Sequence, residues 1–190
     1  MQIITKSAFL EDEENSIERL RNEVFIYPTD TLYGLGCNAE KPELVNRIRE
    51  IKDAYDQPFS VIAPSKDWIK ENLGYKEEFD RYLEKLPGPY TLIMDIRNKS
   101  CVSLETTASK ESLGVRIPDN WFTEIVNKAG IPIITTSVNR HGEAPVTEID
   151  NVPENIKSKT DFAIDDGKIE GSPSTLINLT RSPPEMIERK

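Results

Sequence analysis

A polar loop that directly follows an apolar strand most constrains what this chain can fold into. Residues 24–27 have the β-branched and aromatic composition of a buried strand, and the next residues read Pro-Thr-Asp-Thr. In open α/β sheets, ligands bind in the crevice beyond the carboxyl ends of the strands. We therefore expect a ligand site within residues 25–39, where Gly34 and Gly36 would allow positive φ or a close approach to the ligand. An ordinary strand-to-loop connection would read the same way, since two glycines two residues apart are a weak signal.

A second strand, predicted for residues 131–135, runs into another loop of hydroxyl and amide side chains at residues 136–142. Two strands that end in such loops indicate polar groups converging on one crevice, which a single loop does not. Helices alternate with these strands, and one of them ends near Lys52 after apolar residues at helical spacing. This alternation favours an α/β fold in a single domain over residues 1–190.

Two further segments carry specific expectations. Residues 122–129 have the apolar spacing of a helix, which Asp119 or Asn120 would cap and Gly130 would close. Residues 97–111 are polar and lack periodicity, so they are predicted to form a loop or a pair of short edge strands.

Composition excludes several classes of protein. The chain has 33 acidic and 24 basic residues, a net charge of −9, which argues against a protein that grips phosphate backbones nonspecifically. Any contact with nucleic acid therefore needs a local basic patch. Cys37 and Cys101 stand far apart and lack CxxC spacing, which indicates neither a disulfide framework nor a zinc site. With no signal peptide or membrane-spanning run in the sequence, we expect a cytoplasmic protein with no membrane contact.

Common catalytic motifs are missing. There is no Walker A loop, no GxGxxG and no GxSxG. His141 could serve Ser137 as a base, but the loop contains no orienting acid, so an exposed loop histidine is the favoured reading. The pair Asp165-Asp166 before a glycine is more typical of a solvated turn than of a metal site, and no protein ligand set for a metal is visible.

Arg116 is the most informative single charge. It lies within the apolar strand segment GVRIP, where a charge is costly unless it meets a carboxylate or a phosphate. A buried structural ion pair is the alternative explanation. Lys52 ends a helix, where the helix dipole favours a cation in any case.

Five blocks of sequence together resemble the YrdC/Sua5 family, the threonylcarbamoyl-AMP synthases. Any one block is modest evidence, but five in the family's order are highly specific. Longer members of this family carry a further C-terminal domain, so the resemblance implies a catalytic domain alone. The blocks are FIYPTDTLYGLGCNA at residues 25–39, LPGPYTLIM at 86–94, LGVRIPDN at 113–120, TTSVNRHGEAPVTE at 135–148 and STLINLT at 174–180.

The resemblance implies a twisted mixed open α/β sheet with flanking helices and a large concave cavity. In that cavity L-threonine, bicarbonate or CO2, and ATP with Mg2+ would become threonylcarbamoyl-AMP and pyrophosphate. The product would pass to the machinery that places the t6A modification on tRNA. Two alternatives stay open, namely a noncatalytic RNA-binding protein with the same fold and carbamoyl-adenylate chemistry on another acceptor.

Matching the family's motifs to this sequence implies which residues form the site. The resemblance implies that Lys52 and Arg116 carry the catalysis through charge and positioning, since no covalent enzyme intermediate is needed. Small hydroxyl groups would read the side chain of L-threonine. The residues implied for L-threonine are Thr31, Arg116, Ser137 and Ser174, and those implied for ATP are Lys52, Gln57, Ser112, Asn139, Thr147 and Arg189.

One stretch departs from the family pattern. Residues 52–58 read KDAYDQP, with Ala54 where the family carries an arginine, and the stretch is one residue short. Losing one charge-assisted phosphate contact costs roughly 1.5–3 kcal/mol. We hypothesise that Arg47 or Arg49 compensates for the missing guanidinium.

Overall fold

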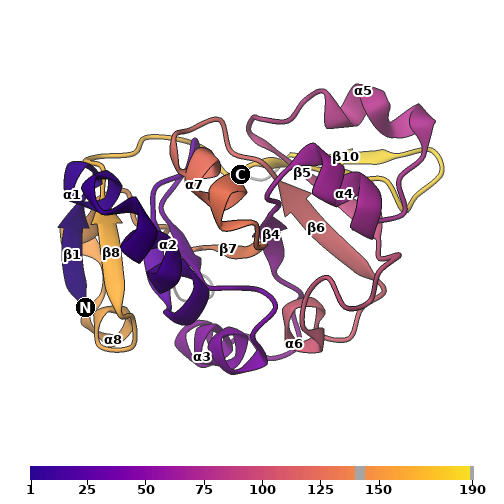
Figure 1. The fold of residues 1–190 in the computed structure, drawn as a ribbon. Coiled ribbons are helices and arrows are strands. Elements are labelled where there is room, and N and C mark those ends of the chain that lie inside the picture. The colour runs from indigo at the N-terminus through magenta and orange to yellow at the C-terminus, as the bar shows by residue number, and fades with distance from the viewer. Residues whose placement is uncertain (140–143, 189–190) are drawn as a thin grey trace.

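The computed structural model describes residues 1–139 and 144–188 (Figure 1). Its strands form one sheet in the order β1-β8-β2-β3-β7-β4-β6-β5-β9-β10. The strands are β1 (Gln2–Thr5), β2 (Phe25–Tyr27), β3 (Gly34–Gly36), β4 (Ser60–Ile62), β5 (Tyr90–Asp95), β6 (Ser112–Arg116), β7 (Ile133–Ser137), β8 (Phe162–Asp165), β9 (Thr175–Asn178) and β10 (Glu185–Ile187). The helices are α1 (Lys6–Glu11), α2 (Glu13–Asn22), α3 (Pro42–Lys52), α4 (Lys66–Asn72), η1 (Glu77–Phe79), α5 (Asp80–Leu83), α6 (Leu104–Thr107), α7 (Phe122–Ala129), η2 (Ile149–Asn151) and α8 (Glu154–Lys157).

The sheet is mixed and open. β1 and β2 run parallel to β8, β4 runs parallel to β6, and β5 runs parallel to β9, whereas β3 and β7 are antiparallel to their neighbours. β1 and β10 form the two edges and lie at opposite ends of the molecule in Figure 1. The predicted mixed α/β sheet with flanking helices is confirmed. No helix in residues 1–139 or 144–188 combines the length and the apolar character needed to cross a membrane.

Apolar side chains pack in two clusters. The first joins α1, α2 and α7 to the sheet through a stack of aromatic rings that includes Phe9, Phe25, Phe122 and Phe162. The second contains the buried residues of α3, α4 and α8. The helical periodicity at residues 42–52 predicted this inward face of α3 correctly.

Gly34 and Gly36 were expected to allow positive φ or a close approach to a ligand, and the structure gives them a different role. Gly34 and Gly36 form β3, which pairs with β2 and β7, and neither has positive φ. The ring of Tyr27 lies across them, and its hydroxyl donates to the carbonyl of Ile134 at 3.0 Å. A Cβ on Gly36 would lie 2.6 Å from both Tyr27 Cε1 and the Ile134 carbonyl oxygen. The glycines are therefore required by close packing inside the protein.

Replacing Gly36 with alanine is expected to lower the free energy of unfolding by about 1–3 kcal/mol, because β7 or Tyr27 must move to admit the methyl group. Urea unfolding would measure the loss. Gly74→Ala is the matched control, since its Cβ would meet nothing closer than 3.4 Å. Equal losses in both variants would contradict the packing explanation.

Two local predictions need correction. Residues 97–111 contain the short helix α6, whose N-terminus is capped by the Ser103 hydroxyl, where only a loop or edge strands were expected. The N-cap of α7 is Trp121 without a side-chain cap, because Asn120 donates instead to the carbonyl of Pro28 at 2.8 Å. The backbone amide of Asp119 likewise donates to Asp30 at 3.0 Å. Gly130 closes α7 at a φ of 69°, as predicted.

Candidate functional site

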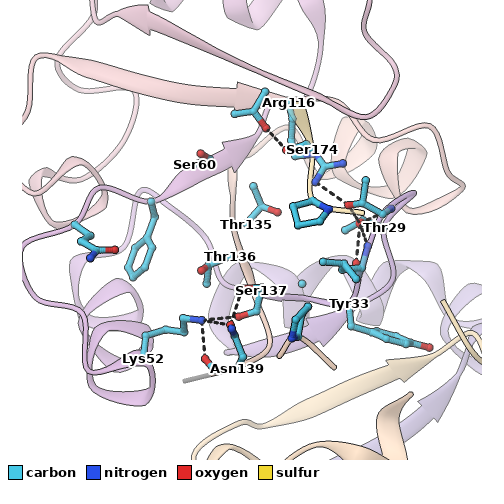
Figure 2. Close-up of a pocket in the computed structure, with 18 of the residues that line it drawn as sticks. Thr29, Tyr33, Lys52, Ser60, Arg116, Thr135, Thr136, Ser137, Asn139 and Ser174 are labelled. Carbon is cyan, nitrogen blue, oxygen red and sulfur yellow. Dashed lines mark hydrogen bonds between the residues drawn. The ribbon is translucent and has the colours of Figure 1, made fainter. Parts of the chain in front are cut away.

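A cavity of about 450 Å³ opens where the loops after β2 and β7 meet the end of β6 and the connection from α3 to β4. Its walls bring together residues far apart in the sequence (Figure 2). Lys52 and Asn139 lie at one end of the view, whereas Arg116, Ser174 and Thr29 lie at the other. The predicted convergence of two polar loops on one crevice is therefore confirmed. The predicted site residues that line this cavity are Thr31, Lys52, Gln57, Arg116, Ser137, Asn139 and Ser174.

Arg116 projects from the last position of β6 and is only 6% exposed. Its Nη1 donates to the hydroxyl of Thr31 at 3.2 Å, and its Nη2 forms an ion pair with Asp30 Oδ1. Burial lowers the pKa of Arg116, and the charge of Asp30 opposes that shift. The structural ion pair considered for this residue is thus present, although the buried Nε has no partner among the described residues. Arg116 nevertheless lines the cavity, so its positive charge borders the space where a ligand would bind.

Hydroxyl groups line the same end of the cavity. The Thr29 hydroxyl donates to the carbonyl of Leu32 at 2.7 Å and accepts the amide of Thr31 at 3.1 Å, which fixes the turn after β2. Ser174, just before β9, shares a hydrogen bond of 2.7 Å with Thr91 on β5. Neither Asp30 nor Thr91 was predicted as a site residue. Thr91 reads as part of an apolar strand, and the only signal for Asp30 was its place in the polar loop.

The segment before β9 is packed tightly against the turn after β2. A Cβ on Gly171 would clash with the carbonyl of Thr31, so only glycine allows this approach. Tyr33 fastens the segment from the other side, because its hydroxyl donates to the carbonyl of Gly167 at 2.7 Å and accepts the amide of Asp166 at 3.0 Å. Burial raises the pKa of Tyr33 to about 12. The hydroxyl is therefore a fixed neutral donor at neutral pH.

At the opposite end, Lys52 joins α3 to the loop after β7. Its Nζ donates to the carbonyls of Ser137 at 2.8 Å and Asn139 at 2.6 Å, and to Oδ1 of Asn139 at 2.6 Å. The Ser137 hydroxyl also donates to Oδ1 of Asn139, at 2.6 Å. Lys52 is 7% exposed, yet it lines the cavity. The three N–H donors of this ammonium are thus engaged by the loop after β7, so Lys52 fixes that loop and brings its positive charge to the cavity wall.

Two residues predicted for ATP lie outside the cavity lining, and a third is outside the described residues. Ser112 begins β6 opposite Asp95, at the other end of the strand from Arg116, and does not line the cavity. Thr147 also lies outside the lining, and its carbonyl accepts the amide of Ile169 at 2.9 Å. Arg189 is outside the described residues. Their roles stay predictions.

Sequence analysis singled out two further features, His141 and the Asp165-Asp166 pair. His141 lies outside the described residues. Asp166 accepts the indole N–H of Trp121 at 2.7 Å and lies 3.6 Å from Lys6, which fits a turn held by polar contacts. Within residues 1–139 and 144–188, no group of three or more His, Cys, Asp or Glu side chains could hold a metal ion.

The compensation hypothesis for Ala54 is wrong for both arginines. Arg47 pairs with Asp161 at 3.0 Å, away from the cavity. Arg49 is 4% exposed and directs its guanidinium to backbone carbonyls, and it does not line the cavity either. Ala54 itself lines the cavity. Among the described residues, the charges that reach the lining are therefore those of Lys52 and Arg116.

Comparisons with known proteins identify relatives of this fold. The Sua5/YciO/YrdC family model, described as telomere recombination, matches residues 19–190. A candidate threonylcarbamoyl-AMP synthase of Methanocaldococcus jannaschii is 32% identical over 166 residues, which cover 85% of this chain and 77% of that protein. The threonylcarbamoyl-AMP synthase of Vibrio campbellii is 31% identical over 140 residues, 70% of this chain and 75% of that protein.

A solved structure extends the comparison to three dimensions. The crystal structure of P. abyssi Sua5 complexed with L-threonine superposes with a TM-score of 0.85 at 27% identity and covers 97% of this chain. This chain spans 56% of the length of that Sua5 protein. Sequence and fold agree across nearly all of the chain. The chain belongs to the Sua5/YciO/YrdC family.

Proposed function

We propose that this chain is an L-threonylcarbamoyladenylate synthase. It would condense L-threonine, bicarbonate or CO2, and ATP to threonylcarbamoyl-AMP and pyrophosphate. The observation that carries the proposal is the cavity itself, which is lined by a buried guanidinium at one end and a buried ammonium at the other. Relatives that bear the synthase name, and a Sua5 structure complexed with L-threonine, support it.

The end around Arg116 suits an amino acid. The guanidinium of Arg116 would bond the substrate carboxylate, while Asp30 keeps it oriented. The hydroxyls of Thr31 and Ser174 would read the hydroxyl of L-threonine. A site built to hydrogen-bond a substrate hydroxyl rejects analogues that lack it, because its own polar groups would then stay unpaired. Valine is the analogue that tests this selectivity.

The end around Lys52 suits the nucleotide. The amine of L-threonine would lose a proton and bond to the carbon of CO2, giving a carbamate. A carbamate oxygen would attack the α-phosphorus of ATP, and the bond to the leaving pyrophosphate would break. Lys52 and Asn139 would orient the phosphates from this end, and Gln57 lines the same wall. Mg2+ held by the phosphates of ATP would supply charge neutralisation for the leaving pyrophosphate.

The direct test is pyrophosphate release from ATP by the purified protein with bicarbonate and Mg2+. We expect release that depends on L-threonine and is not supported by valine, because valine cannot engage the cavity hydroxyls. Release that ignores the amino acid would favour carbamoyl-adenylate chemistry on another acceptor. No release, combined with salt-sensitive RNA binding, would favour the RNA-binding alternative. Both outcomes contradict the proposal.

Transfer of the product onward to tRNA would require partners. The adenylate would leave the cavity for the t6A transferase machinery, and an RNA contact would need a local basic patch, because the whole chain carries a net charge of −9.

A further inference from the structure

Arg49 is a buried arginine whose hydrogen bonds all end on backbone. Its Nη1 donates to the carbonyls of Ala54 at 2.6 Å, Tyr55 at 2.9 Å and Gln57 at 3.1 Å. Its Nε and Nη2 both donate to the carbonyl of Glu105, the former at 3.0 Å. None of the ion pairs between described residues includes Arg49. The charges of Asp56 and Glu105 act on Arg49 from nearby, but the hydrogen bonds of its guanidinium go to these carbonyls.

Three of these carbonyls belong to the connection between α3 and β4, residues 53–59, which forms one wall of the cavity, and the fourth, that of Glu105, belongs to α6. Ala54, Gln57, Pro58 and Phe59 of this connection line the cavity on the side of Lys52. The connection contains no helix or strand and starts from Asp53 in the left-handed conformation, at a φ of 52°. Its position therefore depends on contacts outside regular secondary structure.

Few other contacts hold this connection. The Ala54 amide donates to the Arg49 carbonyl at 3.1 Å, and the Phe59 amide donates to the Thr106 carbonyl at 2.9 Å. Between these two residues, the described part of the chain shows no further backbone bond, and Tyr55 is 60% exposed. A segment with few buried apolar contacts is stable only as far as its remaining hydrogen bonds allow. Arg49 also lies 4.7 Å from the centre of the Phe59 ring, which fixes the last residue of the wall.

We propose that Arg49 is a positioning residue that fixes this wall of the cavity for ATP. The inference rests on the proposed function, because it assigns ATP to the end of the cavity around Lys52. Arg49 does not supply the phosphate contact that Ala54 cannot make. It acts through the backbone, holding Ala54, Gln57 and Phe59 in place beside Lys52. A misplaced wall would affect the nucleotide and leave the distant Arg116 end unchanged.

Arg49→Lys tests this assignment. Lysine keeps the charge, but its compact ammonium cannot reproduce the planar fork that reaches four carbonyls. We expect KM for ATP to rise about tenfold to a hundredfold, as small misplacements do, with KM for L-threonine changed less than about twofold. Hydrogen exchange at the hydrogen-bonded amides of Ala54 and Phe59 should become faster. Arg47→Lys, on the same helix and paired with Asp161, is the matched control.

A merely structural role predicts a different result. It would lower the melting temperature of Arg49→Lys while leaving KM for ATP and the exchange of the loop amides as in the wild type, and that outcome overturns the proposal. Hydrogen exchange needs no activity, so failure of the proposed synthase function and failure of this inference are distinguishable.

A second pair of variants covers the case in which Arg49→Lys does not fold. Tyr55→Gly frees the backbone whose carbonyl Arg49 binds, whereas Tyr55→Ala removes the same exposed side chain without that freedom. KM for ATP should rise further in the glycine variant than in the alanine variant. Equal values would overturn the proposal, because backbone order would then not matter to the nucleotide.

Discussion

Asp30→Ala is expected to lower the free energy of unfolding by about 3–5 kcal/mol, because it leaves the guanidinium of Arg116 buried without its carboxylate. Breaking one partner of a buried pair costs more than the pair contributes, since the remaining charge has lost its hydration as well. The amide of Asp119 loses its acceptor in the same substitution. Urea unfolding measures the loss, and the slope of the transition should stay unchanged.

The double variant Asp30→Ala/Arg116→Met separates charge from packing. Removing both charges should recover much of the stability lost by Asp30→Ala alone, because no unpaired ion then stays buried. Asp150→Ala is the control, because Asp150 is an exposed aspartate. Asp150 forms no ion pair with any described residue. A double variant that loses the sum of the two single losses would show that the ion pair contributes nothing specific.

Sequence periodicity predicted the elements whose own residues determine them. α3 begins at Pro42 and ends at Lys52, with its apolar positions buried. α7 ends at Gly130 in the left-handed conformation that glycine favours. In each case the signal lies within one turn or one helical face, so nothing distant in the chain is needed to interpret it.

β3 could not be predicted in the same way. Its sequence, Gly-Leu-Gly, reads as a loop, and it becomes a strand by pairing with β2 and β7, where Tyr27 and the Ile134 carbonyl leave no room for a Cβ on Gly36. β10 is short and exposed, and it forms only by pairing with β9. Tertiary neighbours decide these strands, and their local propensity does not.

In the candidate site, too, some features could be predicted from local sequence, and others depend on tertiary contacts. The two polar loops indicated where a cavity forms, and the apolar setting of Arg116 indicated that the guanidinium needs an anionic partner. That the partner in this chain is Asp30, 86 positions away, is a property of the fold. Arg49 gave no signal beyond its helical position, because its partners are carbonyls, which every residue carries. Backbone contacts of this kind have no sequence signature.

Arg116→Lys is expected to lower kcat/KM for L-threonine at least about 30-fold, the effect of losing roughly 2 kcal/mol or more at a buried charge pair. Lysine preserves the charge, so the loss of kcat/KM would measure the contribution of the guanidinium's geometry. An ammonium that pairs with Asp30 cannot also reach the Thr31 hydroxyl and a substrate carboxylate in the directions that the three nitrogens of arginine provide. KM for ATP should change little, because Lys52 and Asn139 lie at the other end of the cavity.

Arg19→Lys is the control for this substitution. Arg19 also meets a carboxylate through two nitrogens, at 3.0 and 2.7 Å from Glu23, and it packs over Phe162, but it does not line the cavity. Its replacement should lower stability without changing kcat/KM for L-threonine. If both lysine variants lowered kcat/KM equally, the effect would come from general loosening of the fold. If Arg116→Lys retained the wild-type value, the substrate carboxylate would have to bind elsewhere, because the guanidinium of Arg116 would then have no part in binding it.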